Sequence, residues 1–596
     1  METISKLLFG SVYFFILLGL VIVLLLDKRV REVINKNKKT LILFLLISLV
    51  VLNVLLYLHL SQESFIPSWD FGGFYRKTLE FSDKLNRSIP EAWDNIINSI
   101  NFHEYNFVAE WFLYLPMKII GNSFLRYAIA MANSFLIPTS LLLVLFYLLL
   151  TDNKKRNVLL DWTIYFVIIL FGPNIYSLVQ GYIGSAGLFF ILILMMFIYL
   201  KKYEKVNIPL AILTGLLLLL LLIVRRWFAY WVVSFFVSLV LPYILIKDKR
   251  IYLKPIIINC FIAGVVALGI LILAFNPLFK TITTYNYSEA YSVMKATGPV
   301  EVILSFIQTY GILFVLLMIF GIIKSYKKEE FWLSLICVVQ IVVSVILFNQ
   351  VQRFGSHHYY IINIPCLILI IMGMSYLTDF VTKKVLTIGL VLFNLLTVIN
   401  YQKTLVLKNE VFKPLFIGTN LLLSEPLPMI RVTDRIDEIQ ALVSRLNNQA
   451  GDYDYFYTIA SSSLFNEDIL RNALLPYDIN GLKNVIPSSV YDLRDYLPKD
   501  FFNYQYIIVS EPLILQFKEE EQRVVSILGH FILSDPIAKD YYKLIEDVVI
   551  TNDIHIKVYR RTDTIPNDVR NYVSELFKEY YPNEPRMYEF TMVDGE

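Results

Sequence analysis

Long apolar runs alternate with short polar segments as far as residue 400 of the 596-residue chain. A helix of about 20 apolar residues can cross the roughly 30 Å of hydrocarbon in a bilayer, so the runs predict about twelve membrane helices. They lie over residues 7–26, 40–60, 123–150, 158–172, 185–200, 206–224, 228–246, 256–274, 301–323, 331–348, 361–378 and 385–400. Some runs are interrupted, notably around Gly172-Pro173 and from Gly181 to Gly184.

Beyond residue 400 the pattern changes to that of a soluble α/β domain. Helices are predicted over 433–449, 464–475 and 517–530, and strands over 454–460, 504–510, 541–550 and 554–561. Thr433 is the expected N-cap of the first helix, and Asn552-Asp553 joins the last two strands as a pair. Strands that alternate with helices predict a small, mostly parallel sheet. We therefore expect a transmembrane domain over 1–400 and a soluble domain over 401–596.

Composition supports a membrane protein. The chain is 57% hydrophobic and only 17% charged, against about 25% charged residues in soluble domains. This composition excludes an ordinary soluble enzyme, a disordered chain and a fibrous protein. All three cysteines lie in apolar runs, so no disulfide framework is expected in the soluble domain.

Charge predicts the orientation of the helices. Alternate loops contain 21 Lys and Arg residues, and they are 27–39, 151–157, 201–205, 247–254, 324–330 and 379–384. Short basic loops stay in the cytoplasm. The N-terminus, the long loop 61–122 and the soluble domain are then extracytoplasmic. We expect a multi-pass protein of the plasma membrane, and the abundance of Ile, Lys, Asn and Tyr suggests a bacterial source.

Unusual polar residues gather on the predicted outer side. These candidate site residues are Asp70, His103, Glu104, Arg225, Arg226, Arg353, His357 and His358. Asp70 follows Ser68-Trp69, and a carboxylate among aromatic residues at the membrane surface suits a general base. The alternative for Asp70 is a helix N-cap. His103 and Glu104 could supply a second acid or a metal ligand, or only a cap and a loop salt bridge.

The basic residues suit an anionic ligand. Arg225-Arg226 stands between two apolar runs, where guanidinium groups can bind a lipid phosphate bidentately or snorkel to headgroups. Arg353, His357 and His358 precede the eleventh helix, and the histidines could bind phosphate, stabilise a leaving group or ligate a metal. Interfacial packing is the alternative for both histidines. A divalent metal stays open as a cofactor, because no motif of strong metal-ligand spacing is present.

Several functional classes lack their motifs. The sequence contains no Walker motif, no GxSxG and no HExxH, which argues against an ATP-driven pump and a membrane zinc protease. Apart from Asp161 and Glu301 near run ends, charged residues are missing from the apolar runs, which disfavours an ion-coupled transporter. We expect the lipid bilayer as a partner and no nucleic acid.

The long loop 61–122 starts near Asp70, contains a predicted amphipathic helix over 88–101 and ends with the stretch His103 to Pro116. This loop, the many membrane helices and the outer C-terminal domain resemble the GT-C superfamily of polytopic membrane glycosyltransferases. The plan is similar to polyprenyl-phosphate-sugar-dependent members such as protein mannosyltransferases and aminoarabinose transferases. One extra helix before the Asp70 loop departs from that plan.

The resemblance implies an inverting glycosyltransferase that uses a polyprenyl-phosphate-linked sugar on the outer face of the membrane. It implies Asp70 as the base, with Glu104 and His103 in support. It also implies that the donor phosphate is held by Arg225, Arg226, Arg353, His357 and His358. The acceptor would be a cell-envelope glycan, a lipid or a protein. The alternatives are a lipid-linked oligosaccharide ligase or polymerase, and a non-enzymatic flippase or scaffold.

Overall fold

The computed structural model describes residues 2–152, 157–326, 328–377, 389, 427–551 and 553–593. Their contacts divide the chain into two compact units. The helical unit comprises Met1–Gln62 and Glu80–Ile430, and the sheet unit comprises Glu63–Leu79 and Arg431–Glu596. The division falls inside helix α4 (Trp69–Arg87). The predicted helix 385–400 lies outside the described residues, apart from residue 389.

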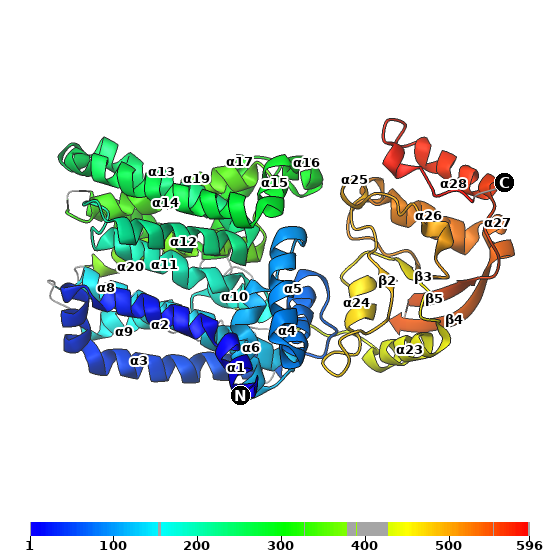
Figure 1. The fold of residues 1–596 in the computed structure, drawn as a ribbon, viewed down its shortest axis with the longest axis horizontal. Helices are drawn as coiled ribbons and strands as arrows, with labels where there is room; N and C mark the ends of the chain where they lie inside the picture. The colour runs from blue at the N-terminus through cyan, green and yellow to red at the C-terminus, as the bar shows by residue number, and fades with distance from the viewer. Residues whose placement is uncertain are drawn as a thin grey trace. The chain divides into compact units, whose positions relative to one another are not determined.

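The helical unit consists of apolar helices joined by short turns (Figure 1). Its first half contains α1 (Glu2–Gly10), α2 (Val12–Leu25), α3 (Lys28–Leu60), α5 (Ile89–Phe102), α6 (Val108–Ile120), α7 (Phe124–Met131), η1 (Ala132–Leu136), α8 (Ile137–Leu150), α9 (Val158–Ile169), α10 (Gly172–Gln180), η2 (Ile183–Gly187) and α11 (Leu188–Tyr199). Its second half contains α12 (Ile208–Val224), η3 (Arg226–Phe228), α13 (Ala229–Leu245), η4 (Lys247–Tyr252), α14 (Leu253–Ala274), α15 (Asn276–Thr284), α16 (Tyr287–Ala290), η5 (Ser292–Met294), α17 (Pro299–Tyr310), α18 (Ile312–Ser325), α19 (Phe331–Asn349), η6 (Ser356–Ile361) and α20 (Asn363–Ser375).

The predicted count of about twelve membrane spans is not confirmed. Among the described residues six helices are long and apolar enough to cross a membrane, or up to eight if each of two bent pairs is one span. Three predicted spans form shorter apolar helices, namely Ile183–Tyr199, Ile208–Val224 and Asn363–Ser375. At 1.5 Å per residue, the 17 residues of α12 extend about 26 Å, which is less than a full hydrocarbon thickness.

A sharp bend interrupts the predicted span 301–323. Helices α17 and α18 meet at 99°. The break is at Gly311, whose φ of 79° lies in the left-handed region that favours glycine. Val300 and Ile303 on α17 are among its exposed apolar residues. An apolar exposed face on a helix turned away from its neighbour is typical of a helix that lies in a membrane surface.

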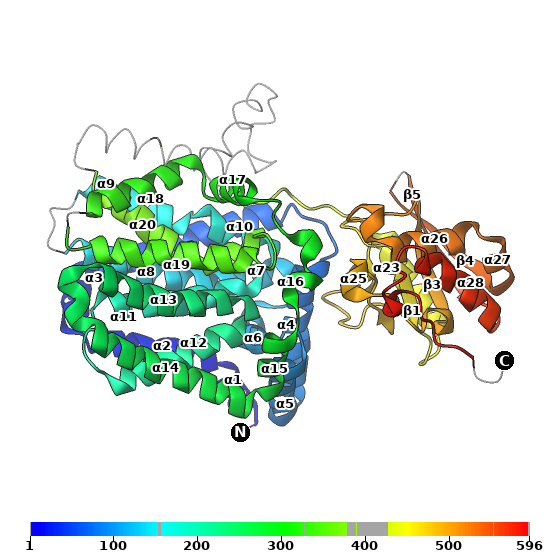
Figure 2. The same cartoon turned by 90° about the horizontal axis from the view of Figure 1, so that it is seen from above.

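The predicted amphipathic helix 88–101 is confirmed as α5. Ser88 caps it by accepting a hydrogen bond from the Glu91 amide, and Ile96 and Ile100 on one face are buried. Helices α5, α15 and α16 lie across one end of the bundle in both views (Figures 1 and 2). This end of the helical unit contains the turns that carry most of the candidate site residues.

The sheet unit contains five strands in the order β2-β1-β3-β5-β4. Its strands and main helices are α23 (Ile436–Gln449), β1 (Phe456–Ile459), α24 (Glu467–Asn472), β2 (Val485–Ile486), α25 (Asp492–Asp495), β3 (Tyr506–Glu511), α26 (Arg523–Ser534), α27 (Pro536–Tyr541), β4 (Tyr542–Thr551), β5 (Ile554–Arg561) and α28 (Asn567–Lys578). The four predicted strands and the pairing of the last two are confirmed. Alternate residues of β3 face opposite layers, with Ile508 packed toward α23 and Ile507 toward α26.

Two details of the predicted soluble domain are wrong. The sheet is mixed rather than mostly parallel, because β1 pairs in parallel with β2 and β3, whereas β5 pairs antiparallel with β3 and β4. A connection as short as the one between β4 and β5 permits only an antiparallel pair. Thr433 is not the helix cap, because α23 begins at Ile436 after Arg435. The Thr433 hydroxyl accepts a hydrogen bond from the Ile66 amide instead, at 3.3 Å.

Candidate functional site

Four connections of the helical unit bring aromatic and basic side chains together. We call the following six residues the arginine–histidine cluster: Tyr105, Tyr182, Arg225, Trp227, His357 and His358. They come from the α5–α6 loop, the turn between α10 and η2, the junction of α12 with η3, and η6. The structure therefore brings together three of the predicted site residues, and it adds three aromatic residues to them.

His357 stacks on Tyr182, with the ring centroids 4.0 Å apart and the planes 11° from parallel. The ring centroids of His357 and His358 lie 3.9 Å apart. The rings of Trp227 and His358 are nearly perpendicular, with their centroids 5.9 Å apart. Tyr182 reaches this place because α10 ends at Gly181, whose φ of 102° turns the chain in a left-handed C-cap. The turn at Gly181, part of the glycine interruption seen in the sequence, thus places Tyr182 in the cluster.

Arg225 ends α12 and turns extended, which directs its guanidinium toward aromatic faces. The guanidinium carbon lies 4.8 Å from the ring centroid of Tyr105 and 6.0 Å from that of Trp227. Two hydrogen bonds tie the α5–α6 loop to this junction: Asn106 Nδ2 donates to the Ile223 carbonyl at 2.6 Å, and Arg226 donates to the His103 carbonyl. These two hydrogen bonds hold the loop that carries Tyr105, so that its ring lies against the guanidinium of Arg225.

Electrostatics separates the roles of Arg225 and His357. Burial, and then the positive charge of Arg225, lower the pKa of His357 from 6.5 to about 3. At neutral pH the His357 imidazole is therefore uncharged. It can offer one N–H and one acceptor nitrogen to a ligand, while the positive charge of the cluster comes from Arg225.

His358 has contacts typical of a turn-forming residue. Its Nδ1 accepts a hydrogen bond from the Gly355 amide at 3.0 Å, and its Nε2 lies 3.5 Å from Nε2 of Gln352. The side chain is buried against Phe348. Because Nδ1 is an acceptor, the ring proton of neutral His358 sits on Nε2. His358 therefore supports the loop that presents His357.

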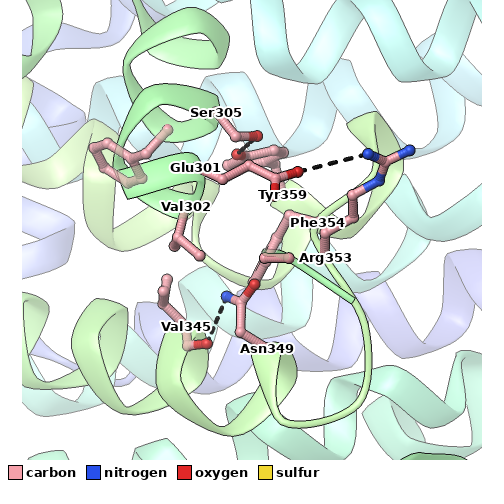
Figure 3. A pocket seen from close by; sticks show the side chains of 10 residues that line it. Glu301, Val302, Ser305, Val345, Asn349, Arg353, Phe354 and Tyr359 are labelled. Carbon is pink, nitrogen blue, oxygen red and sulfur yellow. Dashed lines mark hydrogen bonds and ion pairs between the residues drawn. The ribbon is translucent and has the colours of Figure 1, made fainter. Parts of the chain in front are cut away.

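Arg353 lines a small hollow beside η6 (Figure 3). Its Nη1 lies 3.6 Å from Oε1 of Glu301, and the Tyr359 hydroxyl shares a hydrogen bond with Ser305 at 2.9 Å. The rest of the lining is largely apolar and includes Val302 and Phe354. Arg353 thus balances a carboxylate at the rim, whereas Arg225 lies against aromatic rings.

His103 and Glu104 face other partners. His103 is the C-cap of α5, and its amide donates to the Ser99 carbonyl at 3.1 Å. Oε1 of Glu104 accepts a hydrogen bond from the Tyr291 hydroxyl at 3.0 Å, in an exposed position. These two contacts agree with a cap at His103 and a loop contact at Glu104.

Asp70 belongs to the sheet unit. It lies in the first turn of α4, which begins at Trp69, so it does not occupy the N-cap position considered in the sequence. Its negative charge acts on Asp468 of α24, as do the positive charges of Arg76 and Arg471. Charged residues of α4 and α24 therefore influence Asp468 together within the sheet unit.

The sequence did not single out Tyr105, Tyr182 or Trp227. Tyr105 and Trp227 are next to candidates that it did single out, and Tyr182 follows the glycine interruption, so each had a local signal. No group of three or more His, Cys, Asp or Glu side chains that could hold a metal ion occurs among the residues the structure describes.

No model of a known protein family matches the chain, and no curated protein matches it. Among solved structures, the chain is similar to the crystal structure of ArnT from Cupriavidus metallidurans bound to undecaprenyl phosphate. That similarity covers 87% of this chain and 97% of that chain, with 9% sequence identity and a TM-score of 0.43.

Proposed function

We propose that this protein is a membrane glycosyltransferase that moves a sugar from a polyprenyl-phosphate donor to an acceptor hydroxyl on the extracytoplasmic face. The observation that carries the proposal is the position of Arg225 against Tyr105 and Trp227, with neutral His357 stacked on Tyr182 beside it. Guanidinium groups bind phosphate oxygens bidentately. Aromatic faces and a neutral N–H donor beside the cation suit the sugar that the phosphate carries.

In the proposed reaction the acceptor oxygen attacks the anomeric carbon as Asp70 takes its proton. The bond between that carbon and the phosphate oxygen breaks, and its electron pair leaves with the polyprenyl phosphate. Arg225 stabilises the negative charge that develops on the phosphate. One displacement inverts the anomeric configuration, and the products are the glycosylated acceptor and the polyprenyl phosphate. Glu104 and Arg353 remain supporting candidates in this scheme.

A lipid-linked oligosaccharide ligase or polymerase, the alternative function, would use a histidine as the base instead of Asp70. A pKa of about 3 makes His357 a weak proton acceptor. The contact of His358 Nδ1 with the Gly355 amide occupies its acceptor nitrogen. Both observations favour a carboxylate base and therefore the monosaccharide transferase. The acceptor we propose is a glycan, lipid or protein of the bacterial cell envelope.

The test is transfer from labelled polyprenyl-phosphate sugars in membranes that contain equal amounts of the parent, Asp70→Asn or Arg225→Gln. Asp70→Asn should lose transfer and keep donor binding, because it removes only the base. Arg225→Gln should weaken donor binding. Arg250→Gln is the matched control, since Arg250 is exposed on η4 and donates to the Ile244 carbonyl. Equal transfer by the parent and Asp70→Asn would contradict the role of Asp70. A parent that transfers none of the sugars would contradict the proposed function.

A further inference from the structure

The stack of Tyr182 on His357 joins two segments that are 175 positions apart in the sequence. A side-chain hydrogen bond lies beside it, in which the Ser356 hydroxyl donates to Oε1 of Gln180 at 3.0 Å. Ser356 directly precedes His357, and Gln180 is the last residue of α10, two positions before Tyr182. This bond therefore connects the two segments within two residues of each stacked ring.

The turn after α10 relates the position of Tyr182 to that of Gln180. The Gly181 amide donates to the Leu178 carbonyl at 2.9 Å, and the Tyr182 amide donates to the Ser177 carbonyl at 3.0 Å. These two bonds form a Schellman motif, which closes the helix end around the left-handed glycine. Tyr182 thus keeps its place relative to α10, so a contact that holds the end of α10 also holds Tyr182.

Ser356 has a comparably fixed place relative to His357. It begins η6, a 3-10 turn in which the His358 amide donates to the Gly355 carbonyl at 3.0 Å. The Gly355 amide in turn donates to His358 Nδ1 at 3.0 Å. The Ser356 hydroxyl and the His357 ring are therefore carried by one turn that these two hydrogen bonds close.

Helix α10 is attached to the same part of the chain near its other end. The Tyr360 hydroxyl donates to the Asn174 carbonyl at 3.1 Å, and Asn363 Nδ2 donates to Asn174 Oδ1 at 2.8 Å. Both asparagines are buried. The rise along the helix from Asn174 to Gln180 is roughly 9 Å. Loss of the bond at Gln180 would leave the Asn174 end attached and let the end that carries Tyr182 pivot away from η6.

We infer that Gln180 is a positioning residue for the donor site: its hydrogen bond with Ser356 sets α10 against η6 and thereby brings Tyr182 and His357 into the stack. This inference rests on the proposed function, in which Arg225 and His357 bind the donor. Gln180 does not contact the donor in this scheme. It acts on donor binding through the geometry of the stack and not on the chemical step.

The experiment measures binding and transfer of labelled polyprenyl-phosphate sugars by the full chain in detergent. Gln180→Ala should weaken donor binding about fivefold, as expected for one hydrogen bond, and keep kcat at saturating donor within about twofold of the parental value. Ser356→Ala should have the same effect, and Ser356→Thr, which keeps a hydroxyl, should restore most of the affinity. Gln440→Ala is the matched control, because Gln440 of α23 also donates a part-buried side-chain hydrogen bond, to the Ala473 carbonyl at 2.8 Å.

Two further measurements separate positioning from a general loss of stability. In double-mutant cycles, adding Ser356→Ala to Gln180→Ala should cause no further loss of donor affinity, and the loss caused by Gln180→Ala should be smaller when His357 is already alanine. Hydrogen exchange of the amides of residues 181–183 and 357–359 should accelerate in Gln180→Ala, while exchange in α14 stays at the parental rate. The exchange readout needs neither donor nor turnover.

The outcomes distinguish the inference from the proposed function. A parent that binds and transfers the donor while Gln180→Ala binds it equally well contradicts the positioning role and leaves the proposed function intact. An equal loss from Gln180→Ala in the parent and in His357→Ala would show that Gln180 does not act through the stack. Unchanged exchange at both segments also overturns the inference, whatever the activity. A parent that binds and transfers no donor removes the proposed function and this role in donor binding together.

Discussion

Gly184 approaches the indole of Trp227 so closely that a β-carbon at this glycine would lie 2.8 Å from the ring. The same β-carbon would lie 3.1 Å from the ring of Tyr360. Real β-carbons essentially never come within 3.0 Å of another heavy atom, so the indole of Trp227 would have to move. The arginine–histidine cluster therefore requires a glycine at position 184, because any side chain there would displace Trp227.

Gly184→Ala should weaken donor binding by about tenfold, which corresponds to about 1.4 kcal/mol. The added methyl group displaces Trp227, and overpacking of this kind costs about 1–3 kcal/mol. Donor titration in detergent measures the effect. Gly269→Ala is the control, because a β-carbon at Gly269 in α14 meets nothing within 4 Å. Equal affinities of Gly184→Ala and Gly269→Ala would show that Trp227 does not contribute to the donor site.

The state of His357 gives a prediction about pH. Because its pKa is lowered to about 3, His357 should contribute no titration to donor binding between about pH 5 and 8. His357→Gln, which stays neutral and can donate N–H, should keep more affinity than His357→Ala. A rise in parental affinity from pH 7.5 to 5.5 that His357→Gln abolishes would mean that His357 binds the donor as a cation.

The apolar helices could be predicted from the sequence because each apolar run by itself indicates a helix. The number of spans that this pattern predicts is not confirmed, since periodicity does not reveal a 99° break such as the one at Gly311 or the final length of α12. The glycine interruption from Gly181 to Gly184 was visible in the sequence. Its consequence, the stack of Tyr182 on His357, depends on a residue 175 positions away and was not.

The candidate site shows the same limit. Arg225 was identifiable because adjacent arginines between apolar runs are costly without a function or an interface. Tyr105 stands next to the candidate Glu104 in the sequence, but the contact of its ring with the guanidinium of Arg225 joins residues 120 positions apart, and no local pattern indicates it. The attachment of Glu63 to Arg431 lies beyond any local pattern for the same reason.

The ion pair between Glu63 and Arg431 leads to a prediction about stability. Glu63→Ala should destabilise the sheet unit by about 3–5 kcal/mol, because it leaves the mostly buried Arg431 without its carboxylate. Limited proteolysis or thermal unfolding of the full chain measures the change. Glu575→Ala removes an exposed partner of Lys578 and should change stability by less than about 1 kcal/mol. Similar effects of the two variants would show that residues 63–79 do not stabilise the sheet unit.

Asp492 should make the stability of the sheet unit depend on pH. Burial raises the pKa of this carboxyl from 3.8 to about 6, although it accepts hydrogen bonds from the Arg523 amide at 2.6 Å and the Tyr581 hydroxyl at 2.7 Å. Between about pH 4 and 6 the folded state therefore binds more protons than the unfolded state. The free energy of unfolding should decrease by about 3 kcal/mol as pH rises through this range.

The measurement is the unfolding of the parent and Asp492→Asn at several pH values. Burial also raises the pKa of Glu467, so that residue adds a decrease of the same sign and the variant should flatten the pH dependence without removing it. Asp547→Asn, a change at a half-exposed acid on β4, should keep the parental slope. A steeper decline in Asp492→Asn, or a parental stability that increases between pH 4 and 6, would mean that Asp492 is held as a carboxylate in the folded protein and that its hydrogen bonds outweigh its burial.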